Sequence, residues 1–491
     1  MPRRHLPWEI PGPTPLPLVG WRGNLLQFGM DALGYTGRLQ QRYGPVAALV
    51  RGGSAPLNAM IPDSIGSVMA VGPKYNQQLF SNMEDYHIAL QLGSEGTKYA
   101  RLGAGLLNMN GEKHRQQRRW IMPSFQKKRI EGYVPDMVAL TQEVLDSWTP
   151  GQPQDLARQM RLLTMRIAGK TLFGEDLSDA AGGLGTVIDE WINLTGAVSV
   201  LVFPYDLPFT PYRKFLQLSA RLDEAIAAMI QRKRARGVME PDVISQLVHT
   251  RDADGARMTE DELIGQANLL FLAGHETTAN ALTWTLLLLM QHPAVMADLY
   301  DELHGKLHGA VPTPETLGDL PLLDRVIKES MRILPPVPLT SRTALKSVQV
   351  GPYTLPERTE IVLSMYLTHR DPDLYPQPAR FDPDRWLRCE PTAYEYLPFG
   401  AGARMCAGMT FALIEAKVVL AMLLQRYRPE LRPHTRIDRQ VNLTLAPKQG
   451  LPALIQKQDR EFTRSRAEIT GNLREMVACG EVPARKRARA R

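Results

Sequence analysis

The chain has 491 residues, of which 44% are hydrophobic and 22% are charged. This balance is typical of a soluble globular protein and excludes a disordered or fibrous chain. The formal net charge is +7, but residues 484–491, ARKRARAR, carry five basic side chains and leave only +2 for the rest. We interpret this tail as a solvated, disordered end, and contact with nucleic acid or anionic lipid is the alternative interpretation.

The three cysteines, Cys389, Cys406 and Cys479, have no paired spacing. This argues against a disulfide framework or a CxxC-type zinc site and favours a reducing compartment, so we expect a cytoplasmic protein. Prolines interrupt the apolar residues of segment 1–20 before any secretory hydrophobic region forms, which predicts a proline-rich N-terminal segment. The longest apolar tract, 267–290, contains GHETTAN, and its glutamate would be costly in lipid, so no membrane span is expected.

Helical periodicity dominates the chain, and β-like segments are short. The predicted helices cover residues 133–149, 155–174, 183–199, 212–236, 259–291, 295–308, 320–333 and 409–427. The β-like segments are 46–50, 347–357 and 441–447. No internal repeat or long linker divides the chain. The pattern predicts a mainly α fold with small β-sheets, as a single domain over residues 1–456 followed by a C-terminal extension, 457–491.

The segment NGEKHRQQRRW places His114 and Arg118 four residues apart, on one face of a helix. Taken alone, such a pair is more often a surface feature. If the two basic groups faced an apolar pocket, they would suit the carboxylates of a bound organic acid.

The helix predicted over 259–291 begins at the capping box TEDE and would be about 50 Å long. Near its middle, AGHETT contains Gly274, which weakens the helix, and adds an acid and an alcohol, Glu276 and Thr277. A polar turn facing solvent is one interpretation. The flanks NLLFLA and ALTWTLLLLM are apolar on nearly all sides, which implies burial. A buried carboxylate beside a hydroxyl needs a purpose, and proton relay is one such purpose.

In KESMR, Glu329 and Arg332 are three residues apart on one helical face, where they can pair. If exposed, this pair would have no significance. PARFDPDRW offers Arg385 as a second guanidinium for the same carboxylate. Together the three predict a buried charged network.

The segment FGAGARMCAG, residues 399–408, surrounds Cys406 with small residues and is followed directly by the helix predicted over 409–427. Its glycines allow left-handed turns and close approach of a bulky group. A helix N-terminus favours the thiolate, the form that ligates a metal or attacks as a nucleophile. No histidine lies nearby in sequence to serve as a base. A metal ligand, a nucleophile and a small buried hydrophobe therefore remain open at this point.

Taken together, these motifs resemble those of the cytochrome P-450 family, the haem-thiolate oxygenases, over nearly the whole chain. The family's cysteine loop matches Phe399, Gly402, Arg404, Cys406 and Gly408. Its oxygen-activating helix matches Ala273, Gly274, Glu276, Thr277 and Thr278, and its Glu-x-x-Arg pair and downstream arginine match Glu329, Arg332 and Arg385. The chain departs at the haem-propionate helix, where many members have Trp-x-x-x-Arg and this chain has His114 and Arg118.

The resemblance implies a cytochrome P-450 fold with haem b between a long central helix and the helix that follows the cysteine loop. It implies that Cys406 is the proximal thiolate ligand of the iron, which favours O–O cleavage over reversible O₂ binding. Ala273 and Gly274 would open the central helix for O₂, and Thr277 with Glu276 would deliver protons. The remaining haem contacts that it implies are His114, Arg118, Arg342 and Arg404 at the propionates, and Phe399, Gly400 and Gly408 in the loop.

By the same resemblance, the protein is a soluble bacterial-type monooxygenase. It would insert one atom of O₂ into a lipophilic substrate by hydroxylation or epoxidation. Electrons from NAD(P)H would arrive through a separate ferredoxin or flavodoxin, because 457–491 is too short for a fused reductase. The expected docking face carries Arg115, Arg119, Lys127, Lys128 and Arg129. A haem-thiolate peroxygenase or isomerase is the alternative, against which the intact Glu276-Thr277 pair argues, and a haem-based gas sensor lacks a visible output domain.

The substrate pocket would be walled, by family position, by residues 86–106, 198–209, 270, 273, 337–340 and 443–445. These are mostly apolar. A fatty acid, terpenoid, steroid or polyketide fits, and no residue distinguishes among them.

Overall fold

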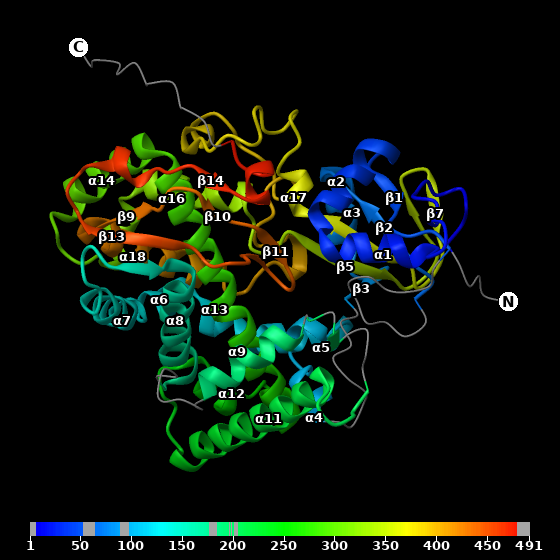
Figure 1. Ribbon diagram of the computed structural model, residues 1–491. Coiled ribbons are helices and arrows are strands. Elements are labelled where there is room, and N and C mark those ends of the chain that lie inside the picture. Colours follow the sequence, from blue (N-terminus) through cyan, green and yellow to red (C-terminus); the bar gives the residue numbers. More distant parts are fainter. Residues whose placement is uncertain are drawn as a thin grey trace.

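The computed structural model describes residues 6–52, 64–88, 98–175, 184–195, 197, 199–200 and 205–478. Figure 1 shows a β-rich part on one side, which contains the blue N-terminal elements, and a larger helical part around helix α13 (Glu260–Gln291). The predicted fold class, mainly α with small β-sheets, is confirmed.

Helix α13 lies at the centre of the helical part because it is apolar on nearly all sides. The predicted capping box is present at its start: Glu262 N–H donates to Thr259 Oγ1 at 3.2 Å, and Thr259 N–H donates to Glu262 Oε2 at 2.9 Å. The helix packs against α8 (Leu156–Ala168), α16 (Pro321–Ile333), α18 (Met409–Arg426) and α4 (Lys98–Leu102). It therefore forms the spine on which the other helices are placed.

The other predicted helices agree with the structure to within a few residues. One difference is that α8 ends at Ala168 and continues as a wider π-helical turn, Gly169–Phe173, rather than as α-helix to residue 174. The remaining helices are α1 (Trp21–Met30), α2 (Ala32–Tyr43), α3 (Pro73–Ser81), α5 (Gly111–Ile121), α6 (Lys127–Glu131), α7 (Val134–Asp146), α9 (Leu184–Thr195), α11 (Pro211–Arg236), α12 (Val243–His249), α14 (Pro293–Leu307), α15 (Pro314–Gly318) and α17 (Met365–Thr368).

The β-rich part contains a five-stranded sheet with the order β1-β2-β8-β5-β3, which sequence patterns missed apart from its first strand. Its strands are β1 (Val46–Ala48), β2 (Ser67–Ala70), β8 (Glu360–Ser364), β5 (Leu339–Ala344) and β3 (Tyr86–His87). All residues of β1, β2 and β8 are buried, so these short strands lack the polar and apolar alternation that identifies a half-exposed strand. Strand β5 carries Arg342 from this sheet to the cysteine loop.

Two of the predicted β-like segments are hairpins rather than single strands. Segment 347–357 forms β6 (Val348–Val350) and β7 (Tyr353–Leu355), and segment 441–447 lies in β11 (Arg439–Val441) and β12 (Leu445–Pro447). The tip of the second hairpin, residues 442–444, lies next to α13. The other small sheets are formed by β4 (Pro153–Asp155), β13 (Pro452–Lys457) and β9 (Tyr427–Leu431), and by β10 (Thr435–Arg436) with β14 (Ile469–Thr470).

The described part of the predicted C-terminal extension packs against the main core. Phe462, Leu473 and Met476 are buried in the same hydrophobic cluster as α13. Residues 479–491, with Cys479 and the basic tail, lie outside the described residues. Among the helices that the structure describes, none is long and apolar enough to cross a membrane.

Candidate active site

The predicted cysteine loop is a tight turn closed by a backbone hydrogen bond. The Cys406 N–H donates to the Phe399 carbonyl at 2.9 Å. Gly400 and Gly402 have φ values of +68° and +67°, a conformation that residues with a Cβ rarely adopt. Helix α18 begins at Met409, so the thiol lies just before a helix N-terminus, as predicted.

Gly402 also permits a close approach between the cysteine loop and α3. A Cβ atom at this position would lie 2.3 Å from the Phe80 carbonyl oxygen, so any larger residue would push the two segments apart. The Phe80 ring stacks in turn against the Arg342 guanidinium, whose Cζ lies 4.8 Å from the ring centroid. The glycine thus brings a cation from β5 to the loop.

The Cys406 side chain has exposed surface but has dense protein on its other sides. Burial raises the pKa of its thiol, while the Gly408 N–H and the Arg118 charge act in the opposite direction. The predicted helix-terminus effect is therefore present but does not dominate. A coordinated metal ion would deprotonate the thiol outright.

Three arginines from distant segments gather at the cysteine loop. Arg118 Nη2 donates to the Met405 carbonyl at 2.8 Å, and Arg404 Nη2 donates to Asn110 Oδ1 at 2.6 Å. Arg342 is only 4% exposed and donates to the carbonyl of the residue before it at 2.8 Å. Within the described residues, none of the three has a carboxylate at ion-pair distance. The predicted propionate-binding arginines are thus brought together without acidic partners.

Burial, and to a smaller extent like charge within the cluster, lowers the pKa values of its members. Burial and the Arg404 charge lower the pKa of Arg342 to about 10, and burial and the Arg118 charge lower the pKa of Arg404 to about 10. Burial and Arg404 lower the pKa of His114 to about 4, and His114 Nδ1 is buried without a hydrogen-bond partner in the part that the structure describes. A buried cation without a counter-charge is unfavourable, so Arg342, with the half-buried Arg118 and Arg404, suits an anionic ligand.

On α13, the predicted oxygen-activating residues lie along one turn. Thr277 is half-buried, and its hydroxyl donates to the carbonyl of the exposed Ala273 at 2.9 Å. Gly274 has a packing role that its sequence context did not suggest: a Cβ there would lie 2.9 Å from Leu172 Cδ1. Its lack of a side chain allows the end of α8 to approach α13 closely.

The Glu276 carboxylate is half-buried rather than fully enclosed, although the apolar flanks predicted burial. The Thr444 hydroxyl, at the tip of the β11–β12 hairpin, donates to Glu276 Oε1 at 2.8 Å. Asn280 Nδ2 donates to Thr444 Oγ1 at 2.9 Å. Glu276 Oε2 is buried and has no hydrogen-bond partner in the described residues. Sequence analysis gave neither Asn280 nor Thr444 a role at this acid, because their contact exists only in three dimensions.

The predicted network of Glu329, Arg332 and Arg385 is present and buried. Arg332 donates two hydrogen bonds to the Glu329 carboxylate, both at 2.9 Å, and Arg385 Nε donates a third at 3.2 Å. The Glu329 and Arg332 side chains are 0% exposed. The remaining guanidinium hydrogens go to backbone carbonyls of residues 369 and 376–380. Both guanidinium groups thus share the Glu329 carboxylate and use backbone carbonyls for other hydrogens, although the three side chains together carry a net charge of +1.

A family model described as Cytochrome P450 matches residues 10–453. The chain belongs to the cytochrome P450 family.

Similar proteins agree with this assignment. This P450 is 35% identical over 371 residues to cyclooctatin synthase of Streptomyces melanosporofaciens. The aligned residues make up 72% of this chain and 79% of that protein. It is 31% identical over 446 residues to cyclooctat-9-en-7-ol 5-monooxygenase of the same organism, with 87% and 90% covered. It is 32% identical over 341 residues to pentalenene oxygenase of Streptomyces avermitilis, with 67% and 75% covered.

Among solved structures, a cyanobacterial P450 with bound retinoic acid matches with a TM-score of 0.80 at 27% identity, over 91% of this chain and 99% of that one. The protein is therefore a haem monooxygenase, an oxidoreductase that incorporates oxygen from O₂, and its cofactor is haem b.

The residues present fit a haem group. Haem b carries two carboxylates and an iron that takes a thiolate ligand. The cluster of Arg118, Arg342 and Arg404 offers cations without acidic partners, and the orphaned Nδ1 of His114 offers a further polar contact. Cys406 has exposed surface in a loop whose glycines give it a tight turn.

Two buried ionisable residues near this P450's site were not found from the sequence. His369 Nε2 accepts a hydrogen bond from the Leu397 N–H at 2.8 Å, just before the cysteine loop, and burial lowers the pKa of His369 to about 3. Glu415 on α18 is 0% exposed, and burial raises the pKa of its carboxyl well above the usual range, an effect that the nearby Thr278 hydroxyl only partly offsets. A single glutamate in the otherwise apolar helix 409–427 was the available signal for Glu415.

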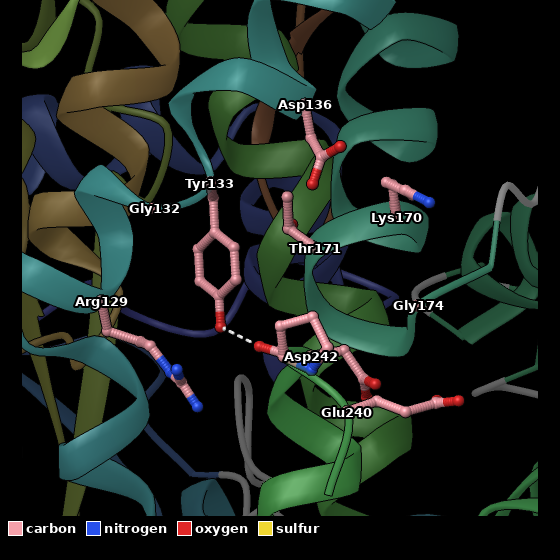
Figure 2. A pocket seen from close by; sticks show the side chains of 10 residues that line it. Arg129, Gly132, Tyr133, Asp136, Lys170, Thr171, Gly174, Glu240 and Asp242 are labelled. Atoms are coloured by element: carbon pink, nitrogen blue, oxygen red, sulfur yellow. Dashed lines mark hydrogen bonds between the residues drawn. The ribbon is translucent and has the colours of Figure 1, made fainter.

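A separate polar pocket of about 370 Å³ lies beside α6, α7 and the π-helical turn (Figure 2). Figure 2 shows the Tyr133 hydroxyl donating to the Pro241 carbonyl across it, at 2.9 Å. The charged residues that line it are Arg129, Asp136, Lys170, Glu240 and Asp242. None of the predicted catalytic or haem-binding residues lines this pocket, and its charged walls are unlike the apolar walls expected for a lipophilic substrate.

Proposed function

We propose that this P450 inserts one atom of O₂ into a lipophilic organic substrate by hydroxylation or epoxidation, with Cys406 as the iron ligand. When bound, the haem supplies the chemistry of O₂ reduction and oxygen insertion. The main support for this proposal is that an exposed thiol lies beside a cluster of arginines without acidic partners in the described residues. In addition, an acid and an alcohol, Glu276 and Thr277, lie on the central helix.

Each group of residues has a distinct task in this proposal. Arg118, Arg342 and Arg404 hold the two haem carboxylates by charge-assisted hydrogen bonds, with His114 as a further contact. The loop residues Phe399, Gly400 and Gly408 keep the backbone close to the ring. Thr277 holds and donates a proton at its Oγ1, and the Glu276 carboxyl group, once protonated, replenishes it, while the exposed Ala273 adds no large side chain beside them.

For the substrate, we propose a lipophilic carbocyclic compound of the terpenoid class. Two of the similar proteins are named for the oxidation of cyclooctat-9-en-7-ol and of pentalenene, which supports this choice over a fatty acid, steroid or polyketide. The expected wall residues are mostly apolar. A spectral titration with a library of such compounds, watching for loss of the iron-bound water, would test the class.

For the electron donor, we propose a separate acidic ferredoxin or flavodoxin with its NAD(P)H reductase. The supporting residues are the cations of α5 and α6, of which Arg115, Arg119, Lys127 and Lys128 are exposed and Arg129 is half-buried. Glu112 and Glu131 pair with three of them, so Lys128, exposed and without an ion pair among the described residues, should matter most. Lys128→Glu should raise the KM for the donor protein without changing substrate affinity. A cytoplasmic location is part of the same proposal, supported by the free thiols of Cys389 and Cys406.

The test of the proton-delivery role is Thr277→Ala. The variant should bind haem normally and still consume NAD(P)H, but should release hydrogen peroxide and form at least about tenfold less product per NAD(P)H, because a placed acid or base contributes ~10²-fold or more. Added peroxide should restore part of the product. The matched control is Thr283→Ala, since Thr283 lies on the same helix and, within the described part of the chain, its hydroxyl bonds only to the Ala279 carbonyl at 2.7 Å. Unchanged product per NAD(P)H in Thr277→Ala would favour a peroxygenase or an isomerase.

The test of the ligand assignment is Cys406→Ala. It should abolish the red-shifted carbon monoxide band of the reduced protein, because the thiolate causes that band. Cys389→Ala should retain it. Persistence of the band in Cys406→Ala would show that another residue ligates the iron.

A further inference from the structure

Three side chains on one face of α13 bind the β11–β12 hairpin. Glu276, Asn280 and Trp284 recur at every fourth position, so they lie above one another along the helix. Thr444 contacts the first two, and Trp284 Nε1 donates to the Leu445 carbonyl at 2.9 Å. The hairpin tip is therefore attached to the central helix directly beside the acid of the oxygen-activating motif.

The hydrogen bonds in this attachment have a fixed direction. The Asn280 amide can only donate through Nδ2, so the Thr444 oxygen acts as acceptor in that contact. The single hydroxyl proton of Thr444 is then free to point at Glu276 Oε1, 2.8 Å away. Each bond polarises the next, so the chain from amide to hydroxyl to carboxylate orders all three groups.

Glu276 depends on this chain for its orientation. No lysine or arginine lies at ion-pair distance from it among the described residues, and its other oxygen, Oε2, is buried without a hydrogen-bond partner there. Asn280 and Thr444 are each 4% exposed, so bulk water does not compete for their polar atoms. The arrangement anchors one carboxylate oxygen and leaves the other to exchange protons.

We propose that Thr444, held by Asn280, is a positioning residue that orients the Glu276 carboxylate for proton transfer. This inference rests on the proposed role of Glu276 and adds to it the residue that sets its geometry. A small misplacement of a proton-transfer group lowers the rate steeply. Loss of the Thr444 hydroxyl therefore impairs the use of O₂ without removing the acid itself.

The experiment compares Thr444→Val with Thr444→Ser in the haem-loaded enzyme supplied with its electron donor. Valine keeps the size of threonine and loses the hydroxyl, while serine keeps the hydroxyl. We expect product per NAD(P)H to fall about tenfold in Thr444→Val and to stay within about twofold of the original in Thr444→Ser. The solvent deuterium isotope effect on product formation should rise in Thr444→Val. Haem content should be unchanged, and the variants are compared at saturating substrate because residues 443–445 are expected to wall the substrate pocket.

Two further variants isolate the route through Glu276. Asn280→Leu removes the amide that orders the hydroxyl and should give a smaller loss, about twofold; it also serves if Thr444→Val folds poorly. The double variant Thr444→Val/Glu276→Gln should be no worse than Glu276→Gln alone, because the hydroxyl acts only through the carboxylate. Thr283→Val is the matched control for a lost threonine hydroxyl on α13 and should behave as the original protein.

The outcomes separate this inference from the proposed function. If Glu276→Gln impairs product per NAD(P)H and Thr444→Val does not, the positioning role is wrong and the proton role of Glu276 stands. If the losses in the double variant multiply fully, Thr444 acts independently of Glu276 and the positioning role is also wrong. If Glu276→Gln has no effect, both the proton role and the positioning role are overturned.

Discussion

Two groups of buried or half-buried arginines in this P450 differ in how their charge is balanced. Arg332 and Arg385 share the Glu329 carboxylate and direct their other hydrogens to backbone carbonyls. Arg342 and Arg404, beside the cysteine loop, find only carbonyl and amide oxygens and have no acidic partner in the described residues. The first group has a carboxylate partner within the protein and so stabilises the fold, whereas the second suits an anionic ligand. The presence of an acidic partner, rather than burial alone, separates the structural cluster from the proposed binding cluster.

The largest expected effect is the loss of stability when the network of Glu329, Arg332 and Arg385 is broken. Glu329→Ala leaves Arg332 and Arg385 as buried cations without a counter-charge, so the free energy of unfolding should fall by ~3 to 5 kcal/mol and haem retention should fail. Denaturant unfolding and haem content measure this. Asp301→Ala is the control, because its exposed pair with Arg460 should contribute less than about 1 kcal/mol. Equal stability of the two variants would contradict a structural role for the network.

A substitution in the cluster of Arg118, Arg342 and Arg404 should not lower the stability of the haem-free protein. Arg342→Leu removes a buried cation that has no acidic partner, so the haem-free protein should be at least as stable as the original. Haem affinity should fall about tenfold to a hundredfold, because a hydrogen bond to a charged group contributes ~1.5 to 3 kcal/mol. Thermal denaturation of the haem-free protein and haem transfer to an acceptor protein test the two halves. A large loss of stability without haem would place Arg342 in the structural class.

A third effect concerns His369, whose backbone carbonyl accepts from Arg332 and whose ring accepts from the Leu397 N–H, just before the cysteine loop. Burial, with a smaller contribution from the Arg332 charge, lowers the pKa of His369 in the native protein from 6.5 to about 3. Between these pH values the unfolded chain binds a proton that the native protein does not. The free energy of unfolding should therefore fall as the pH falls, by about 1.4 kcal/mol at pH 5.5.

His369→Gln keeps an acceptor for the Leu397 N–H but does not titrate, so stability curves of this variant should be flatter between pH 6.5 and 5. His434→Gln, at an exposed histidine, is the control. A curve as steep as that of the original protein would assign the acid sensitivity to other groups.

The smallest effect is expected from the third group of cations, the basic tail. Deletion of residues 484–491 should leave haem content and turnover unchanged within about twofold, because the segment has no apolar residue able to anchor it in a core. Turnover should be measured with the same electron donor at low and moderate salt. A large loss that salt relieves would mean that the tail contributes to docking of the donor.

Sequence patterns predicted the helical elements well and the sheets poorly. Capped helices such as 259–291 carry their signals within a few residues of each end, so they can be located locally. Strands β2 and β8 are short and fully buried, and their register depends on partners far along the chain. The hairpin at 441–447 was predicted as one β segment, because nothing in VNLTLAP marks its turn.

The amino-acid sequence by itself determined the family, the haem-thiolate chemistry and the members of the Glu329 network, because those motifs combine rare residue types at fixed short spacings. Tertiary structure decided which arginines have an acidic partner and which have none among the described residues. Arg404 reaches Asn110 across 294 positions and Thr444 reaches Glu276 across 168. Such contacts depend on how α3, α5 and the β11–β12 hairpin pack, and no local pattern records that packing. The physical reason is that a side chain's charge and hydrogen-bonding capacity are encoded at its own position, whereas its partner is chosen by the fold.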